Sequence, residues 1–186
     1  APEKRDDDLA RLVASQVDTV RKQVDYHLSR AQAAASVQVP GMRTAVEPVI
    51  RGLVRVMQRV YADRQIEFVL LPDQGNLVFR GEEQDLQEML GNLIDNASKW
   101  ARSRIEIQVS DESGKFRVSI DDDGKGIAET ERDHVLKRGV RADEQVPGTG
   151  LGLAITADLA RTYGGDLVLA KSSLGGLQVS LILPAV

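Results

Sequence analysis

Cysteine is absent from the sequence, and histidine occurs only twice, as His27 and His134. The absence of cysteine excludes a disulfide framework and a thiolate metal site. Two histidines are too few for the usual zinc sites. Neither GxxxxGKS nor GxxxxGKT occurs, which excludes a P-loop as the means of binding phosphate.

Long hydrophobic runs and a strong charge of either sign are also missing. No segment approaches the length that spans a bilayer, and the N-terminal APEKRDDDLA lacks the pattern of a signal peptide. The formal net charge of -4 argues against a nucleic-acid partner, because contacts to a phosphate backbone need clustered Lys and Arg. The remaining composition, 42% hydrophobic and 28% charged residues, is that of a soluble globular protein.

The first part of the chain is predicted to form one long helix. Between residues 9 and 35 there is no Pro or Gly, and apolar residues recur in steps of three and four. Such a helix is roughly 40 Å long, too long to be packed along its length by one small domain. Pro40-Gly41 then indicates a linker. We therefore predict a boundary near residue 38, followed by a separate domain over residues 39–186.

The second part alternates between helical and extended patterns. Apolar steps of three and four predict helices, and alternating apolar residues predict strands. Residues 128–150 have no sustained period, so a long loop is predicted there, and loops of that length are usually functional. Together the elements predict a layered α+β domain with a mostly antiparallel sheet. The predicted helices cover 44–62, 82–100 and 151–163, and the predicted strands cover 66–70, 77–79, 105–109, 116–120, 167–170 and 177–183.

Three polar side chains form a stripe on the predicted helix 82–100. Asn92, Asn96 and Lys99 lie at i, i+4 and i+7, so they share one face. Amide oxygens beside an ammonium group suit a magnesium triphosphate, because Mg²⁺ accepts neutral oxygen ligands and takes others from phosphate and water. The alternative is that all three are ordinary solvated side chains.

A second motif, DDDGKG, follows the predicted strand 116–120. The alternation of that strand places Asp122 on its inward face, where a carboxylate needs a donor. The exocyclic amine of adenine supplies one, whereas guanine presents an oxygen at that position. Gly124 and Gly126 allow the backbone to come close to a base. The alternative is an ordinary Asp-Gly turn.

A third motif, GTGLG, leads directly into the predicted helix 151–163. Free backbone N–H groups at a helix N-terminus bind phosphate. The motif does not fit the dinucleotide-binding pattern, since no strand precedes it and its third glycine comes one residue early for GxGxxG. Its residues are Gly148, Thr149, Gly150, Leu151 and Gly152.

GNLIDNASKW, DDDGKG and GTGLG, in this order, resemble the N-box, G1 box and G2 box of sensor histidine kinases. That ATP-binding domain has the Bergerat fold, shared with DNA gyrase B, MutL and heat-shock chaperones. The resemblance thus implies a two-layer α/β sandwich, with a mixed, mostly antiparallel sheet and helices on one of its faces. Together with RGVRAD and SSLGG, the strings are most similar to the PhoQ type. The resemblance implies that the cofactors are ATP and Mg²⁺. It makes Asn96 the principal magnesium ligand and Asp122 the residue that reads adenine.

The resemblance also implies supporting roles for other residues. Asn92 and Lys99 would assist at the metal and the phosphates, and Trp100 would lie against the adenine or ribose, with a plain core position as the alternative. Arg138 and Arg141, in the lid segment, are candidates for phosphate contacts. Leu136 stands where the F-box of the family usually has Phe.

The hydrolytic branch of the superfamily has a Glu four residues before the metal-binding Asn, and this chain has Asn92 there. An amide is not a general base, so transfer to another nucleophile is favoured over hydrolysis. The acceptor in the family is a histidine on a helical hairpin, and neither His27 nor His134 has the flanking residues of that H-box. The alternatives are an anti-sigma-factor type serine kinase and a non-catalytic ATP-binding module.

The resemblance further implies how the chain is arranged in a larger protein. Residues 1–38 would be the second helix of the dimerisation and phosphotransfer hairpin, and residues 39–186 the catalytic domain. The expected partners are ATP, a response regulator and, through the hairpin, a second copy of the kinase. The domain is expected in the cytoplasm, with the parent kinase anchored in the bacterial inner membrane.

Overall fold

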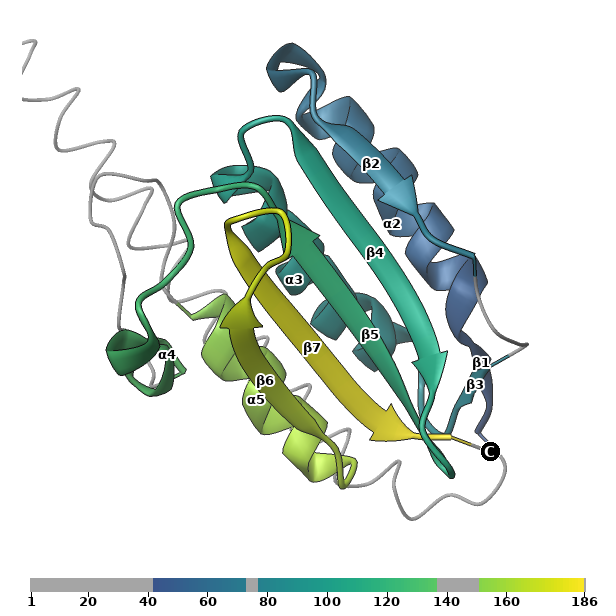
Figure 1. Ribbon diagram of the computed structural model, residues 1–186. Coiled ribbons are helices and arrows are strands. Elements are labelled where there is room, and N and C mark those ends of the chain that lie inside the picture. Colours follow the sequence, from purple (N-terminus) through teal and green to yellow (C-terminus); the bar gives the residue numbers. More distant parts are fainter. Residues whose placement is uncertain (1–41, 73–76, 137–150, 186) are drawn as a thin grey trace, which may run out of the picture.

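A five-stranded sheet forms one layer of the described part of the chain, and helices lie over one of its faces (Figure 1). The structure is a computed structural model that describes residues 42–72, 77–136 and 151–185. The strand order is β2-β4-β5-β7-β6; only the β2–β4 pair is parallel, and the others are antiparallel. This is the predicted mixed, mostly antiparallel sheet. The strands are β2 (Glu67–Leu70), β4 (Arg104–Asp111), β5 (Lys115–Asp122), β6 (Asp166–Lys171) and β7 (Leu177–Pro184).

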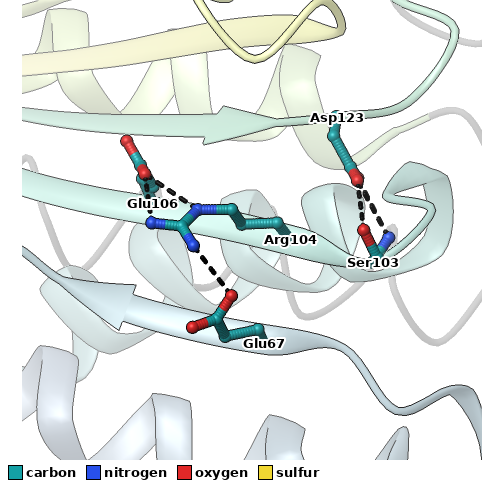
Figure 2. Close-up of polar contacts among 5 residues, drawn as sticks. All are labelled: Glu67, Ser103, Arg104, Glu106 and Asp123. Carbon is teal, nitrogen blue, oxygen red and sulfur yellow. Dashed lines mark hydrogen bonds and ion pairs between the residues drawn. The ribbon is translucent and has the colours of Figure 1, made fainter.

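Alternation along the central strands separates the two faces of the sheet. Ile105 and Ile107 of β4 and Phe116 and Ile120 of β5 are buried against the helices. Residues between them carry polar side chains on the opposite face, where Arg104 of β4 forms ion pairs with Glu67 and Glu106 (Figure 2). Since the period is two, Asp122 at the end of β5 falls on the same face as Ile120 and points to the helix layer.

Three helices make up the second layer: α2 (Val46–Val60), α3 (Glu83–Trp100) and α5 (Gly152–Thr162). Helix α3 is central, since it contacts both α2 and α5. It buries an apolar stripe that includes Leu86, Leu90 and Leu93. Tyr163, after the last residue of α5, donates a hydrogen bond to the buried Asp85 in the first turn of α3. The two helices are therefore antiparallel, and the N-terminus of α5 lies near the middle of α3.

The structure differs from the sequence prediction in two places. The prediction of a loop through residues 128–150 is wrong over Glu129–Val135, which form the short helix α4. A seven-residue helix is too short to show a period, but α4 has Glu129 and Glu131 in its first turn and buries Val135. The predicted start of the helix 44–62 is also wrong, because Thr44–Ala45 form the strand β1, which pairs with β3 (Val78–Phe79), and α2 begins at Val46.

The long N-terminal helix and the boundary near residue 38 lie outside the described residues. No helix in the described ranges is long and apolar enough to cross a membrane.

Candidate nucleotide-binding site

Asp122, at the end of β5, is a carboxylate with only 2% of its surface exposed. Its Oδ1 accepts hydrogen bonds from the backbone N–H of Gly124 at 2.8 Å and of Leu177 at 3.2 Å. Burial raises the pKa of Asp122, and these two hydrogen bonds act in the opposite direction. Among the described residues, both hydrogen bonds to this carboxylate are accepted by Oδ1. The second oxygen, Oδ2, is therefore the acceptor that Asp122 can offer to a ligand.

Glycines surround this carboxylate closely. A Cβ on Gly176 would lie 2.2 Å from Oδ1 of Asp122, and one on Gly124 would lie 2.5 Å from the carbonyl oxygen of Trp100. Gly126 has a φ of 67° and approaches the carbonyl of Gly176. These positions hold glycine because the turn after β5 packs directly on the end of α3 and on the β6–β7 turn. The sequence analysis did not assign Gly176 to the site, although the two glycines of SSLGG could have indicated a close backbone contact there.

Asp123, in the turn after β5, contacts the segment between α3 and β4 (Figure 2). Its carboxylate accepts hydrogen bonds from the backbone N–H of Arg102 at 2.7 Å and from the hydroxyl of Ser103 at 2.7 Å. Burial acts to raise the pKa of Asp123, but the hydrogen bonds from Ser103 and neighbouring backbone N–H groups outweigh it and lower the pKa to about 2. One ionised side chain thus fixes the second motif to the segment that directly follows α3.

The stripe of Asn92, Asn96 and Lys99 lies on α3, and all three residues are half-buried. The side chain of Asn92 is 3.8 Å from the point where a Cβ on Gly152 would lie, so the N-terminus of α5 faces the stripe. Lys99 is held by an ion pair, with its Nζ 2.5 Å from Oδ2 of Asp95. The sequence analysis placed Lys99 at the phosphates and did not foresee this partner.

Trp100, the last residue of α3, is half-buried and is not one of the buried core residues. The Nζ of Lys125 lies 4.6 Å from the centroid of its ring. An ammonium at that distance is attracted by the ring quadrupole. The ring is therefore at the edge of the turn that holds Asp122, and not in a plain core position.

The third motif is only partly described. Leu151 precedes α5, which begins at Gly152, and no side chain of the described residues caps this helix. Leu136 follows α4 and packs against the hydrophobic core, and His134 is exposed. His27 and the predicted phosphate-binding residues Arg138, Arg141, Gly148, Thr149 and Gly150 lie outside the described residues.

The donor set at the stripe can be compared with what magnesium requires. In the described ranges there is no group of three or more His, Cys, Asp or Glu side chains that could hold a metal ion by themselves. Asn92 and Asn96 instead offer neutral amide oxygens on adjacent turns of one helix. That set fits an ion that keeps several waters and takes its other ligands from a bound phosphate chain.

A buried carboxylate in a glycine-lined turn at the end of α3, amide side chains along the same helix and the N-terminus of α5 facing that helix are together typical of a nucleotide-binding domain. Residues 81–186 match the family described as "Histidine kinase-, DNA gyrase B-, and HSP90-like ATPase". That region is more than half of the 186 residues, and the chain belongs to this family.

The similar proteins include sensor kinases and one solved ATP-binding domain. "Sensor protein kinase CarS" of Pseudomonas aeruginosa is 36% identical over 97% of this chain, and "Virulence sensor histidine kinase PhoQ" of Salmonella typhimurium is 29% identical over 92%. The "ATP binding domain of PrrB from Mycobacterium Tuberculosis" is 25% identical, with a TM-score of 0.66 over 80% of this chain and 99% of that one. The described fold and the matched region are those of the ATP-binding catalytic domain of sensor histidine kinases.

The chain spans 40% of the length of CarS and 35% of that of PhoQ. For this domain, the family match and the similar solved structure confirm the resemblance to sensor histidine kinases that the motifs indicated. They also confirm the predicted Bergerat-type fold.

Several residues of the site were not anticipated. Asp123 and Lys125 stand within the second motif, but the sequence analysis assigned neither of them a role. Asp95 is part of the string NLIDNASKW, yet nothing in that string shows which partner it takes. Tyr61 and Arg64 belong to the segment after α2 and contact the end of α3. No local signal predicts these long-range contacts.

Proposed function

We propose that this domain binds Mg-ATP and donates the γ-phosphate to a histidine on a helical hairpin, as the catalytic part of a sensor histidine kinase. The observation that carries the proposal is Asp122, a buried carboxylate with Oδ2 left for a ligand beside glycines that admit no side chain. The family membership supports ATP as the nucleotide.

Asp122 selects the base. Its Oδ2 accepts a hydrogen bond from the exocyclic amine of adenine, while the corresponding oxygen of guanine would be repelled by it. Because the site is buried, a mismatch there leaves a polar group without a partner, which is costly. Trp100, beside the same turn, lies against the adenine or the ribose, and the backbone at Gly124 and Gly126 lets the base approach.

The phosphates lie between the amide stripe and the N-terminus of α5. Asn96, assisted by Asn92, holds Mg²⁺, which when bound neutralises charge on the phosphates. Lys99 and the N–H groups at Leu151 and Gly152 bind phosphate oxygens. From the segment outside the described residues, Gly148, Thr149 and Gly150 add backbone donors, and Arg138 and Arg141 add charge.

Phosphoryl transfer depends mostly on positioning and charge neutralisation, so this domain does not need a general base for water. Asn92 occupies the position of the water-activating Glu of the hydrolytic branch, which favours transfer over hydrolysis. An anti-sigma-factor type kinase and a non-catalytic module are not favoured, because the curated relatives are named sensor kinases.

The same family membership suggests how this domain is arranged in a larger kinase. We propose that residues 1–38 belong to a hairpin through which the parent kinase dimerises, and that the phosphoryl group passes on to a response regulator. The domain acts in the cytoplasm, below a parent kinase anchored in the inner membrane.

Calorimetry with Mg-ATP and Mg-GTP tests the base selection. We expect Mg-ATP to bind the wild type more tightly than Mg-GTP, and Asp122→Ala to lose most of the affinity for Mg-ATP. Equal affinity for the two nucleotides, or an unaffected variant, would remove Asp122 from the site.

Asn96→Ala is expected to lose the part of the affinity that depends on Mg²⁺ while the melting temperature without ligand is unchanged.

Incubation with γ-labelled ATP tests the transfer. The chain itself should remain unlabelled, because neither His27 nor His134 lies in an H-box, and a separately supplied hairpin that carries the H-box of the parent kinase should become labelled. Acid-labile, base-stable label on the chain itself would contradict this reading of His27 and His134.

A further inference from the structure

Two side chains from the segment after α2 converge on the last turns of α3. Tyr61 follows the last residue of α2, and Arg64 ends the short 3-10 helix η1 (Ala62–Arg64). The hydroxyl of Tyr61 donates a hydrogen bond to Oδ1 of Asp95 at 2.7 Å. Arg64 donates from Nη1 to the carbonyl of Lys99 at 2.8 Å. Both contacts reach the part of α3 that carries Asn96, Lys99 and Trp100.

Asp95 is shared between Tyr61 and Lys99. Its Oδ1 accepts from Tyr61 and its Oδ2 from Nζ of Lys99. Burial and the hydrogen bond to Asp95 raise the pKa of the Tyr61 hydroxyl, which therefore remains a donor. With one oxygen fixed from outside the helix, the carboxylate presents the other in a defined direction.

Lys99 is therefore held at both ends. Its backbone carbonyl is bound by Arg64, and its ammonium by Asp95. An ordinary i,i+4 ion pair on a helix surface contributes little to stability, partly because two long side chains must be ordered to form it. Here the hydroxyl of Tyr61 already orders the acceptor, so less conformational freedom is lost when Lys99 is fixed.

The charge of Asp95 also needs compensation. Asp95 directly precedes Asn96, so a free carboxylate there would repel a triphosphate bound at the stripe. The ion pair with Lys99 and the hydrogen bond from Tyr61 leave neither oxygen of Asp95 without a partner. The pair presents a localised ammonium instead of an unpaired negative charge.

We propose that Tyr61 and Asp95 are positioning residues for phosphate recognition: Asp95, fixed by the hydroxyl of Tyr61, sets the place of the Lys99 ammonium beside Asn96. This proposal rests on the proposed function, in which Lys99 binds phosphate. It adds that Tyr61, which lies outside the three sequence motifs, affects how tightly Lys99 binds phosphate.

A double-mutant cycle separates positioning from stability. Tyr61→Phe removes only the hydroxyl, and we expect it to weaken Mg-ATP binding by about threefold or more, measured by calorimetry on the full chain. In a Lys99→Met background the same change should have no effect, because its action passes through Lys99. Asp95→Glu, which keeps the charge but displaces it, provides a second variant for the same cycle and the same expectation.

Tyr163→Phe is the matched control. Tyr163 also donates its hydroxyl to an aspartate of α3, the buried Asp85, but at the opposite end of the helix. We expect this variant to lower the melting temperature while leaving the dissociation constant for Mg-ATP unchanged. It therefore shows what the loss of a Tyr–Asp hydrogen bond does through stability alone.

The outcomes distinguish the two proposals. No effect of Tyr61→Phe, or an equal effect with and without Lys99, overturns the positioning role while the proposed function stands. If Lys99→Met binds Mg-ATP as tightly as the wild type, the phosphate contact of Lys99 and the positioning role both fail, and the adenine site at Asp122 is unaffected. If the wild type does not bind Mg-ATP, the proposed function itself fails.

Discussion

At Gly176, the space for a side chain is already filled by Asp122. A Cβ would lie 2.2 Å from the carboxylate oxygen Oδ1 and 2.4 Å from the backbone oxygen of the same residue. Gly175, its neighbour, has open space around it, and only its φ of 104° disfavours a side chain. Lack of space thus requires glycine at position 176, whereas backbone conformation favours glycine at position 175.

Gly176→Ala is expected to destabilise the fold by about 3 kcal/mol and to abolish nucleotide binding, because Asp122 must move. Gly175→Ala should cost about 1 kcal/mol through its backbone conformation and leave Mg-ATP binding intact. Denaturant unfolding and calorimetry on both variants check this. Intact binding by Gly176→Ala would mean that the position of Asp122 is unimportant.

Asp85 provides a residue-scale prediction about pH. Burial raises its pKa above the usual 3.8, and the hydrogen bond from Tyr163 only partly opposes this. Because burial disfavours the charged carboxylate, the folded protein is most stable when Asp85 is protonated. This contribution to stability is fully present below pH 3.8 and is lost as the pH rises through the pKa of Asp85 in the folded state. Asp85→Asn keeps an acceptor for Tyr163 without the charge. We therefore expect the free energy of unfolding of Asp85→Asn, relative to that of the wild type, to increase as the pH rises above 3.8, measured by urea unfolding. A difference that stays constant with pH would contradict this expectation.

At the scale of the element, the end of α3 is stabilised from outside the helix. Arg64 donates to the carbonyls of Ser98 at 2.7 Å, Lys99 at 2.8 Å and Ala101 at 2.7 Å. These are carbonyls that a helix C-terminus leaves without internal partners. A guanidinium can reach several of them at once because its donors form a planar fork.

Arg64→Ala is therefore expected to lower the free energy of unfolding by about 1–2 kcal/mol. Arg64→Lys should recover little of it, since an ammonium is a point charge and cannot bind all the carbonyls together. Thermal unfolding of the two variants is the measurement. Full recovery by lysine would show that charge near the helix end, and not the fork, is what matters.

Gly52, in the interior of α2, is the corresponding case of an element that can be improved. No atom lies within 4 Å of the place where its Cβ would be. Because glycine is a poor helix former, Gly52→Ala should stabilise the domain by about 0.5–1 kcal/mol and leave nucleotide affinity unchanged. A loss of stability on chemical denaturation would mean that glycine is required there for another reason.

At the scale of the whole molecule, nucleotide binding and folding are linked. A ligand that binds only the folded state at about 100 times its dissociation constant stabilises by roughly 2.7 kcal/mol. For a chain of this size we expect Mg-ATP at that concentration to raise the melting temperature by roughly 5–10 °C. Asp122→Ala should show no such rise at the same nucleotide concentration, and an equal rise would place the nucleotide elsewhere.

The sequence by itself determined what depends on neighbouring residues. Periodicity predicted α2, α3, α5 and the strands of the sheet within a few residues, because burial repeats with the period of each element. It also indicated the class of protein, since Asn92, Asn96 and Asp122 lie in short strings with a chemical rationale. It failed at α4 and β1, which are too short to display a period and depend on packing and pairing with distant parts of the chain.

The tertiary structure decided which side chains meet. Tyr61 and Asp95 are 34 residues apart, Ser103 and Asp123 are 20 apart, and Asp122 and Leu177 are 55 apart. Polar partners at such separations depend on strand register and on helix packing, and neither leaves a trace in local composition. For this reason the adenine and magnesium residues could be proposed from the sequence, whereas Tyr61, Asp95, Asp123 and Gly176, which fix their positions, required the fold.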